Sequence, residues 1–473
     1  MSESFPALLE TTAQRLADRP ALVWDGGRLV WRALMRRAAG VAASLARQGV
    51  EPGDTLALSL PNAWPLVAAL LAGLGLGATV APLNPLLAPE ERRRIVAHLR
   101  PRLVVDHVDE AAGEWPGGAP RVAPAAAPAV VLYTSGTTGE PKGAILSHGA
   151  LTVANRAWAG PVMGLVPGDV VLAALPLSHS FGLNGALLAP LLAGVTVVLL
   201  ARFTPEETLR AVARHRVTVF PGVATMFRRV LDAPAFARAD LSSLRLAVSG
   251  AAPCPWGLAE EWRQRTGVRV LRGYGMTELF RPISYLAADP TDLPDAVGRA
   301  VPGVELRVVD DAGADVAAGE VGELWIRSPA AMDGYLGAPE ATSSVLADGW
   351  FRTGDLVTVS PEGWVRIVGR KRELILRGGY SVVPAEVETT LLAHPAVAEA
   401  AVVGVSHAEL GEEVAAFVTL RPGTRAHPDD LIAHCRDRLA AYKYPRQVTI
   451  VDQLPRSATG KVLKSHLGDQ AAR

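Results

Sequence analysis

Tyr133-Thr134-Ser135-Gly136-Thr137-Thr138-Gly139-Glu140-Pro141-Lys142-Gly143 is a stretch of hydroxyl side chains, glycines and one lysine that follows an apolar run, Ala129–Tyr133. Accessible backbone amides, hydroxyls and a cation suit an anion with many oxygen atoms, such as a polyphosphate. The stretch is not a Walker loop, because Gly143 and not Ser or Thr follows Lys142. A polar hairpin turn is the simpler alternative. The length of the pattern favours a phosphate-binding loop around which the chain is organised.

The composition is that of a globular protein without a strong overall charge. The chain has 473 residues, 49% of them hydrophobic, enough for two or three domains. Its 47 basic and 47 acidic side chains give a formal net charge of +0, so we expect neither nucleic acid nor an anionic membrane as a partner. Cys254 and Cys435 lack metal-ligand spacing and the histidines form no H-E-x-x-H pattern. We therefore expect a reducing, cytoplasmic location and no zinc site.

Two long stretches, Asn62–Pro89 and Ser178–Ala201, carry no charged side chain when His179 is neutral. Length alone would allow each to span a membrane. Glycines and prolines interrupt both stretches, and each contains a β-branched run. A buried helix followed by a central strand of a parallel sheet explains them better. The first residues also show no basic start and no apolar signal core, so we expect no integral membrane span.

Short β-rich runs alternate with helical patterns through the first part of the chain. Thr204-Pro205-Glu206-Glu207, for example, begins a helix with a hydroxyl cap, a proline and two acids in the first turn. This alternation predicts an α/β fold with mostly parallel layers. Among the expected strands are Val170–Ala174, Val217–Phe220, Leu244–Val248 and Val268–Leu271, and among the expected helices are Phe5–Leu16, Trp31–Arg47, Gly149–Trp158 and a segment near Pro255–Gln264.

The pattern changes near Asp295 to short strands and tight turns, which predict a small β-barrel or meander at about 295–369. After Arg370 two helical patterns and three strand patterns predict a compact α+β domain. The expected division is a large N-terminal domain, residues 1–369, and a small C-terminal domain, residues 370–473.

Y-T-S-G-T-T-G-x-P-K-G resembles the nucleotide-phosphate loop of the adenylate-forming superfamily, which includes acyl- and aryl-CoA ligases, luciferase and peptide-synthetase adenylation domains. The resemblance covers essentially the whole chain, with motifs from Tyr133 to Lys461 in the family's order. It implies a mobile C-terminal domain, and ATP or AMP, Mg²⁺ and coenzyme A as cofactors. The nucleotide-binding residues that it implies in the loop are Thr134, Ser135, Gly136, Thr137, Thr138, Gly139 and Lys142.

Gly273-Tyr274-Gly275-Met276-Thr277-Glu278 is expected to form a loop at the carboxyl end of a parallel strand, where such sheets bind ligands. It resembles the family's Y-G-x-T-E motif. The resemblance implies that the Tyr274 ring covers the adenine and that Gly275 and Met276 also belong to the nucleotide-binding residues. It also implies that Thr277 contacts the α-phosphate and that Glu278 holds Mg²⁺. One carboxylate plus substrate phosphates is a ligand set that Mg²⁺ accepts.

Trp350-Phe351-Arg352-Thr353-Gly354-Asp355 resembles the family's next motif, in which Asp355 accepts hydrogen bonds from both ribose hydroxyls. Arg370 matches an arginine that also reaches the ribose, and Arg372 matches the hinge about which the C-terminal domain turns. A solvated basic run is the alternative for this last segment.

The C-terminal region carries two further motifs. Pro455-Arg456-Ser457-Ala458-Thr459-Gly460-Lys461 resembles the family's lysine motif, in which Lys461 stabilises the charge between the acid and the α-phosphate. The alternative is an ordinary exposed lysine. Gly378 and Gly379 resemble the loop that lines the pantetheine channel after the domain has turned.

Three segments resemble the acid pocket of the ligases. His179, within Leu175–Phe181, is implied beside the carboxylate or the channel, although a single histidine is more often structural. Ser249, Gly250, Ala251 and Ala252 resemble the segment shared by adenine and acid, and Gly273 is implied nearby. Like the corresponding segment of CoA ligases, it lacks the Asp that amino-acid-activating domains present to the α-amino group of their substrate.

Arg281 departs from the family pattern, which commonly places small residues after the glutamate. Leu279-Phe280-Arg281-Pro282 follows Glu278 instead. A bulky pair and a guanidinium beside the pocket suggest a short substrate that carries a second anionic or polar group. The alternative is that Arg281 lies at the surface and pairs with a neighbouring acid.

The sequence therefore predicts an ATP-dependent, AMP-forming carboxylic acid–CoA ligase of carboxylic acid or fatty acid metabolism. Three alternatives remain: an acyl-AMP ligase that loads the phosphopantetheine of a carrier protein, a luciferase-like monooxygenase, and a non-catalytic nucleotide-binding regulator. The regulator would be expected to have lost Glu278 or Lys461, and both are present. The identity of the acid and the oligomeric state, monomer or homodimer, are not predicted.

Overall fold

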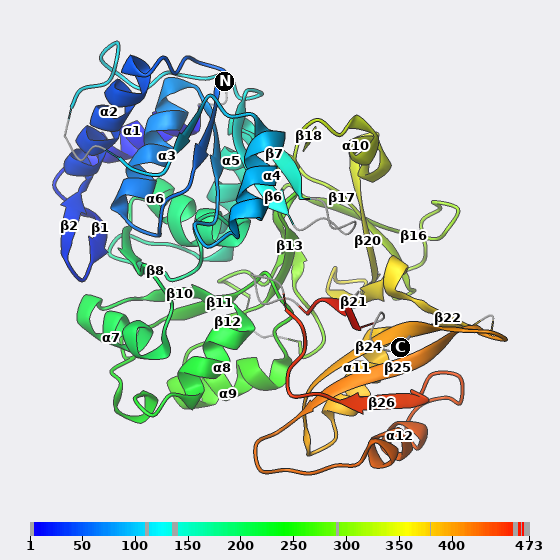
Figure 1. Cartoon of the computed structure of the whole chain (residues 1–473). Helices are drawn as coiled ribbons and strands as arrows, with labels where there is room; N and C mark the ends of the chain where they lie inside the picture. Colours follow the sequence, from blue (N-terminus) through cyan, green and yellow to red (C-terminus); the bar gives the residue numbers. More distant parts are fainter. Residues whose placement is uncertain are drawn as a thin grey trace. The chain divides into compact units, whose positions relative to one another are not determined.

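The computed structural model describes residues 4–108, 113–134, 141–289, 293–378, 380–456, 462–464 and 466–467 (Figure 1). The chain forms two compact units. Unit 1 contains Met1–Leu306 and Ile326–Phe351, and unit 2 contains Arg307–Trp325 and Arg352–Arg473. Arg370 lies within unit 2, so a movable C-terminal domain that begins at this residue stays a prediction.

Unit 1 contains a seven-stranded sheet in the order β12-β11-β10-β8-β9-β1-β2. Neighbouring strands from β12 to β1 are parallel, and β2 returns antiparallel beside β1. β10 and β11 are buried along their whole length, as expected for central parallel strands. The strands are β1 (Pro20–Trp24), β2 (Gly27–Val30), β8 (Val170–Ala173), β9 (Thr196–Leu199), β10 (Val219–Gly222), β11 (Leu246–Ser249) and β12 (Val270–Leu271).

Helices α7 (Pro205–His215), α8 (Ala224–Asp232) and α9 (Trp256–Thr266) lie together on one face of this sheet (Figure 1). α7 begins where predicted, because Thr204 Oγ1 accepts a 3.1 Å hydrogen bond from the Glu207 N–H. Aromatic rings attach the helices to the sheet. Phe220 of β10 packs on Phe227 of α8 and on Trp262 of α9, with ring centroids 5.2 and 6.0 Å apart.

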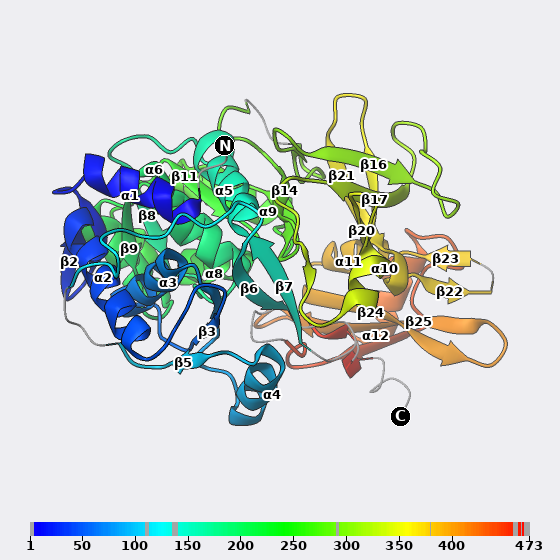
Figure 2. The same cartoon turned by 90° about the horizontal axis from the view of Figure 1, so that it is seen from above.

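A second sheet of unit 1 has the order β18-β7-β6-β4-β3-β5. β5, β3, β4 and β6 are parallel neighbours, whereas β7 and β18 are antiparallel. β6 and β7 lie side by side as a hairpin (Figure 2), so the predicted phosphate loop connects two antiparallel strands. The strands are β3 (Thr55–Leu58), β4 (Thr79–Pro82), β5 (Leu103–Val105), β6 (Pro128–Thr134), β7 (Lys142–Ser147) and β18 (Gly334–Tyr335).

Both uncharged stretches are buried helices followed by parallel strands, as expected. In the first, α3 (Trp64–Leu76) is buried from Leu66 to its end and leads into β4. In the second, the π-helix η2 (Gly182–Leu188) and α6 (Ala189–Ala193) lead into β9. Gly182 is required here, since a Cβ atom would lie 2.1 Å from the carbonyl oxygen of Pro176. Within the described residues, no helix is long and apolar enough to cross a membrane.

The remaining elements of unit 1 complete the α/β layers and add a small antiparallel sheet, β13-β14-β15. The helices are α1 (Phe5–Arg15), α2 (Trp31–Arg47), α4 (Pro89–Leu99), α5 (His148–Ala157), α10 (Pro339–Val345), η1 (Trp158–Val162) and η3 (Phe236–Arg238), and the strands are β13 (Gly273–Met276), β14 (Phe280–Ser284), β15 (Arg299–Ala300) and β19 (Leu346–Ala347).

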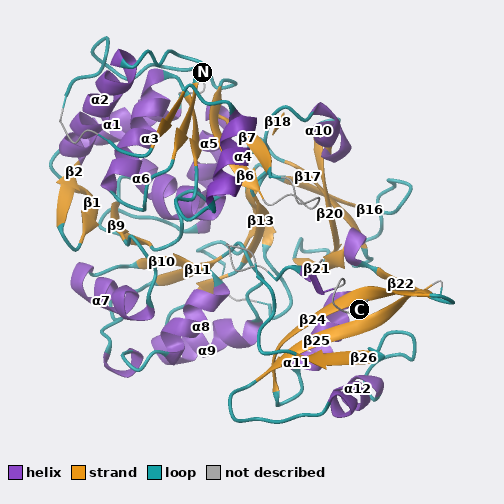
Figure 3. Ribbon diagram, viewed as in Figure 1, coloured by secondary structure: helices purple, strands orange, loops and turns teal. Residues whose placement is uncertain are grey.

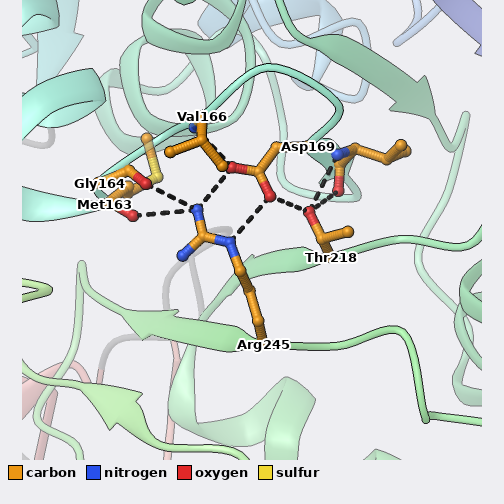
Figure 4. Close-up of polar contacts among 7 residues, drawn as sticks. Met163, Gly164, Val166, Asp169, Thr218 and Arg245 are labelled. Atoms are coloured by element: carbon orange, nitrogen blue, oxygen red, sulfur yellow. Dashed lines mark hydrogen bonds and ion pairs between the residues drawn. The ribbon is translucent and has the colours of Figure 1, made fainter.

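A buried polar network connects the residues that immediately precede three parallel strands, β8, β10 and β11 (Figure 4). Arg245, before β11, forms a 2.6 Å ion pair with Asp169, before β8, and donates to the carbonyl oxygens of Met163 and Gly164. Thr218, before β10, donates a 2.7 Å hydrogen bond to the same carboxylate. Asp169 is only 3% exposed at its side chain, and these bonds compensate for burying its charge.

The β-rich region expected at about 295–369 forms one sheet, β16-β17-β20-β19, with β21 paired to β20. The boundary between unit 1 and unit 2 falls within three strands of this sheet, β16, β17 and β20. β20 and β21 are antiparallel neighbours, and the 3-10 helix η4 (Lys371–Glu373) follows β21. The strands are β16 (Glu305–Val309), β17 (Gly322–Arg327), β20 (Trp350–Val359) and β21 (Val365–Arg370).

Unit 2 ends in the predicted α+β structure. Helices α11 (Pro384–Leu392) and α12 (Pro428–Arg436) pack on one face of the sheet β23-β22-β25-β24, with β26 beside β25 (Figure 3). Residues of β24 alternate between two hydrophobic clusters: Val402 faces the helices, whereas Val403 belongs to the other cluster. The strands are β22 (Ile375–Arg377), β23 (Tyr380–Val382), β24 (Val397–His407), β25 (Gly411–Leu420) and β26 (Gln447–Ile450).

Candidate active site

The two strands that flank the predicted phosphate loop are held in register. Thr134, the last residue of β6, lies opposite Lys142, the first residue of β7. Gly143 follows, where a Cβ atom would lie 2.8 Å from Cγ1 of Val131, so a close approach of the strands requires glycine. The loop residues between them, Ser135, Gly136, Thr137, Thr138 and Gly139, lie outside the described residues.

Tyr335 connects this hairpin to the expected magnesium ligand. The strand β18 pairs with β7, which places Tyr335 opposite Ala144. The Lys142 ammonium lies 5.2 Å from the centroid of the Tyr335 ring, a cation–π contact. The Tyr335 hydroxyl donates a 2.7 Å hydrogen bond to Oε1 of Glu278. The structure therefore brings together Lys142 and Glu278 through a residue that sequence reasoning missed.

The backbone also holds the segment that carries Glu278. The Met332 N–H donates a 2.8 Å hydrogen bond to the carbonyl oxygen of Glu278. In the part of the chain that the structure describes, Tyr335 is the one side chain bonded to the Glu278 carboxylate, so Oε2 has no such partner. A single partly buried carboxylate with one oxygen engaged fits the few-ligand preference of Mg²⁺. No group of three potential metal ligands occurs among the described side chains.

The motif that contains Tyr274 is a strand, not the expected loop. β13 pairs antiparallel with β14, so that Tyr274 lies opposite Ile283. The physical reason is the close approach of two backbones: a Cβ atom on Gly275 would lie 2.1 Å from the carbonyl oxygen of Phe280. Met276 ends the strand, and Thr277, which is buried, precedes Glu278. The expected position after β12 is confirmed.

The pocket segments meet at the carboxyl ends of β11 and β12. These two strands are parallel neighbours; β11 ends at Ser249, with Gly250 next, and Gly273 lies two residues after the end of β12. Ala251 has a φ of 62°, a left-handed conformation in a tight turn, and Ala252 follows it. This edge of a parallel sheet is where α/β folds bind ligands.

Arg281 lies among these residues. Its guanidinium donates to the carbonyl oxygens of Ser249 and Leu271, at 2.7 and 3.3 Å, and to Oγ of Ser284 at 2.9 Å. The side chain is buried. The alternative of a surface arginine paired with an acid is therefore wrong, because strand-end carbonyl groups, and no carboxylate of the described chain, accept its bonds.

His179 lies at the start of the helical segment that precedes η2. Its Nδ1 atom accepts a 3.3 Å hydrogen bond from the Phe181 N–H, and burial lowers the pKa of the ring. His179 is therefore neutral near pH 7. Asn62, which sequence reasoning also missed, holds this segment by bonding the carbonyl oxygen of Leu175 and the N–H of Leu177. The Pro61-Asn62 pair at a strand end was the available signal.

Unit 2 carries the expected ribose residues as a pair. Asp355 on β20 lies opposite Arg370 on β21, and their Oδ1 and Nε atoms are 2.9 Å apart. The Asp355 side chain is buried, whereas that of Arg370 is 34% exposed. Burial and the neighbouring Arg370 charge lower the pKa of Arg372. Gly378 has a φ of 57°, which favours glycine, while Gly379 and Lys461 lie outside the described residues.

The fold is that of an adenylate-forming enzyme, and comparisons with known proteins agree. Residues 9–336 match the family model of the AMP-binding enzyme, and residues 386–461 match that of the AMP-binding enzyme C-terminal domain. The chain belongs to the AMP-binding enzyme family. The predicted superfamily, fold class and enzyme type are confirmed.

Curated relatives and solved structures match along almost the whole chain. The feruloyl-CoA synthase of an Amycolatopsis species is 37% identical over 96% of each chain. A long-chain-fatty-acid–CoA ligase of Yersinia pestis is 33% identical over 98% of this chain and 94% of its own. The crystal structure of ATP-bound MatB from Rhodopseudomonas palustris is 32% identical, covers 98% of each chain and has a TM-score of 0.92.

Proposed function

We propose that the protein is an ATP-dependent, AMP-forming carboxylic acid–CoA ligase. The observation that carries this function is the linked arrangement of Lys142, Tyr335 and Glu278 beside strand ends that carry the pocket segments. Relatives named as CoA ligases, with different acids in their names, support the same reaction class.

The first half-reaction joins the acid to AMP. A carboxylate oxygen of the substrate attacks the α-phosphorus of ATP, an O–P bond forms, and the bond to pyrophosphate breaks. Two anions must meet in this step, so catalysis depends on positioning and positive charge. Lys142 supplies charge beside the loop, and Thr277 offers a hydroxyl to the α-phosphate. When bound, Mg²⁺ held by Glu278 would neutralise phosphate charge.

Unit 2 supplies the remaining groups. Asp355 accepts hydrogen bonds from the ribose hydroxyls, and Arg370, paired to it, fixes the direction of that carboxylate. Lys461 stabilises the charge that develops between the acid and the α-phosphate. Movement about Arg372 then withdraws Lys461 and brings Gly378 and Gly379 to the pantetheine arm.

The second half-reaction transfers the acyl group to a thiol. The sulfur of CoA attacks the acyl carbonyl, a C–S bond forms, and AMP leaves with the oxygen that came from the acid; the thiol proton passes to solvent. A carrier protein with the same phosphopantetheine thiol is the alternative acceptor.

A pyrophosphate–ATP exchange screen over carboxylic acids tests this function. At least one acid should support exchange, and added CoA should convert that acid to its thioester with stoichiometric AMP. ADP as the nucleotide product, or exchange that no acid stimulates, would contradict the function. Exchange without CoA consumption would identify the carrier-protein alternative.

A further inference from the structure

Arg281 is one of the most deeply buried cations of unit 1, with 7% of its surface exposed. It occupies the space that two glycines leave open. A Cβ atom on Gly273 would lie 2.4 Å from the guanidinium, and one on Gly250 would lie 3.2 Å from Nη1. The guanidinium therefore lies directly against the backbone of two segments expected to line the acid pocket.

Aromatic rings enclose the same place. The Arg281 guanidinium lies 5.0 Å from the centroid of the Trp158 ring, and Trp158 stacks on Phe181 at 5.5 Å. Phe181 in turn lies 3.1 Å from the position of a Cβ atom on Gly250. These three large side chains pack together beside the pocket segments, which favours a short substrate over a long acyl chain.

No described carboxylate forms an ion pair with Arg281, although buried cations normally have one. The Cys254 thiol does not serve as the anion, since burial raises its pKa. Burial lowers the pKa of Arg281 to about 9, so the group remains a cation at pH 7.

The Arg281 guanidinium also has N–H groups left that could donate hydrogen bonds to a ligand. A guanidinium has five N–H groups, of which the bonds to Ser249, Leu271 and Ser284 use three. Apart from the weakly bonding Cys254 thiol, the buried Oγ of Ser249 has no hydrogen-bond partner among the described residues. A cation, two N–H groups that donate to no described residue and a hydroxyl form a suitable receptor for a carboxylate.

We infer, on the basis of the proposed function, that Arg281 holds a second carboxylate of the substrate, remote from the one that is activated. The substrate class is then short dicarboxylic acids. The second carboxylate supplies the missing anion and stays unchanged, while the first forms the acyl-adenylate. Arg281 is in this sense a specificity-determining residue.

Pyrophosphate–ATP exchange with acids matched in carbon number tests the inference. The pairs are succinate with butyrate, glutarate with valerate, and phthalate with 2-methylbenzoate. The wild-type enzyme should have a kcat/KM at least about 10-fold higher for the diacid in one or more pairs. Arg281→Met, which keeps length and removes charge, should lower the diacid value by about 10- to 100-fold and change the monoacid value by less than about threefold.

Arg272→Met is the matched control. Arg272 is similarly buried, but its guanidinium bonds the carbonyl oxygens of Leu293 and Pro294 and lies over the Trp256 ring, whereas that of Arg281 bonds Ser249 and Leu271. Arg272→Met should reduce the stability of the protein and change kcat/KM for the diacid and the monoacid of each pair by the same factor.

The outcomes separate the inference from the proposed function. Exchange with monoacids and no diacid preference, or an equal effect of Arg281→Met on both members of each pair, overturns the role of Arg281 and leaves the ligase intact. Exchange with no acid at all overturns both. If Arg281→Met does not fold, the wild-type ratios across the three pairs decide the matter alone.

Discussion

The Tyr335 hydroxyl donates a 2.7 Å hydrogen bond to Oε1 of Glu278, although the two residues are 57 positions apart. Burial and the charge of Glu278 raise the pKa of Tyr335 well above its usual value, so the hydroxyl keeps its proton and acts as the donor. The same ring lies under the Lys142 ammonium. One aromatic side chain thus orients the carboxylate expected to bind Mg²⁺ and contacts the cation at the phosphate loop.

Tyr335→Phe removes this hydrogen bond and keeps the ring. Because a hydrogen bond to a charged group contributes about 1.5–3 kcal/mol, we expect the Mg²⁺ concentration for half-maximal ATP binding to rise by about 10-fold. Calorimetric titration of ATP at several Mg²⁺ concentrations measures this without turnover. Tyr285→Phe, which removes another buried hydroxyl of unit 1, is the control and should leave the Mg²⁺ dependence as it is. An unchanged Mg²⁺ dependence in Tyr335→Phe would show that the bond only supports packing.

Asp355→Ala removes the acceptor for the ribose hydroxyls. The KM for ATP should rise by about 10- to 100-fold, as expected when hydrogen bonds to a carboxylate are lost. The wild-type enzyme should show a smaller loss with 3′-deoxy-ATP, which lacks one of the two hydroxyls. Asp355→Ala tested with 3′-deoxy-ATP should show little further loss, since the variant has already lost the bond to that hydroxyl. If the effects of Asp355→Ala and of 3′-deoxy-ATP on KM were fully additive, the ribose would not bind at Asp355.

Lys461→Ala separates the two half-reactions. Acyl-AMP formation should fall by at least about 100-fold, whereas conversion of supplied acyl-AMP and CoA to thioester should stay within about threefold. Lys464→Ala is the matched control. The Lys464 ammonium lies 3.2 and 2.7 Å from carboxylate oxygens of Glu373 and Glu388, which makes it a structural lysine. Equal losses in both half-reactions of Lys461→Ala would contradict domain movement about Arg372.

Asp169→Asn tests the buried network of unit 1. Burial alone raises the pKa of Asp169, but bonds from Arg245, Val166 and Thr218 outweigh it, so the pKa lies below the ordinary value. A carboxyl with a depressed folded-state pKa contributes stability that is full above the unfolded pKa and is lost as the pH falls through the folded one. The variant should therefore lose about 2 kcal/mol at pH 7 in urea unfolding.

Below about pH 4 the difference between wild type and Asp169→Asn should shrink, because acid protonates the wild-type carboxyl as well. Asp240→Asn, at an exposed ion pair with Arg216, is the control and should leave the stability nearly unchanged at every pH. A difference between wild type and Asp169→Asn that is independent of pH would mean that shape and not charge matters at this site.

Much of the fold could be predicted because local signals agreed with the final environment. The uncharged segment around α3 is buried on all sides, and α7 begins at its Thr cap. The extended course of Gly273–Met276 was missed, since its strand character depends on a partner, β14, and not on β-propensity.

The site was predictable only where a motif is contiguous in sequence. Tyr335 contacts Glu278 and Lys142 through pairing of β18 with β7, two segments far apart in the chain. Such pairing leaves no local pattern at Tyr335. The burial of Arg281 was not predictable either, because an arginine that follows a motif is usually exposed, and here two glycines provide the space.

Transfer of an oxygen isotope tests most directly whether the acid attacks the α-phosphorus. The acid that supports exchange is labelled with ¹⁸O in the carboxylate that reacts, converted with ATP and CoA, and the products are analysed by mass spectrometry. Attack at the α-phosphorus places one labelled oxygen in AMP and none in pyrophosphate. Label in pyrophosphate or inorganic phosphate, or unlabelled AMP, would contradict an acyl-adenylate and with it the roles assigned to Glu278, Tyr335 and Lys142.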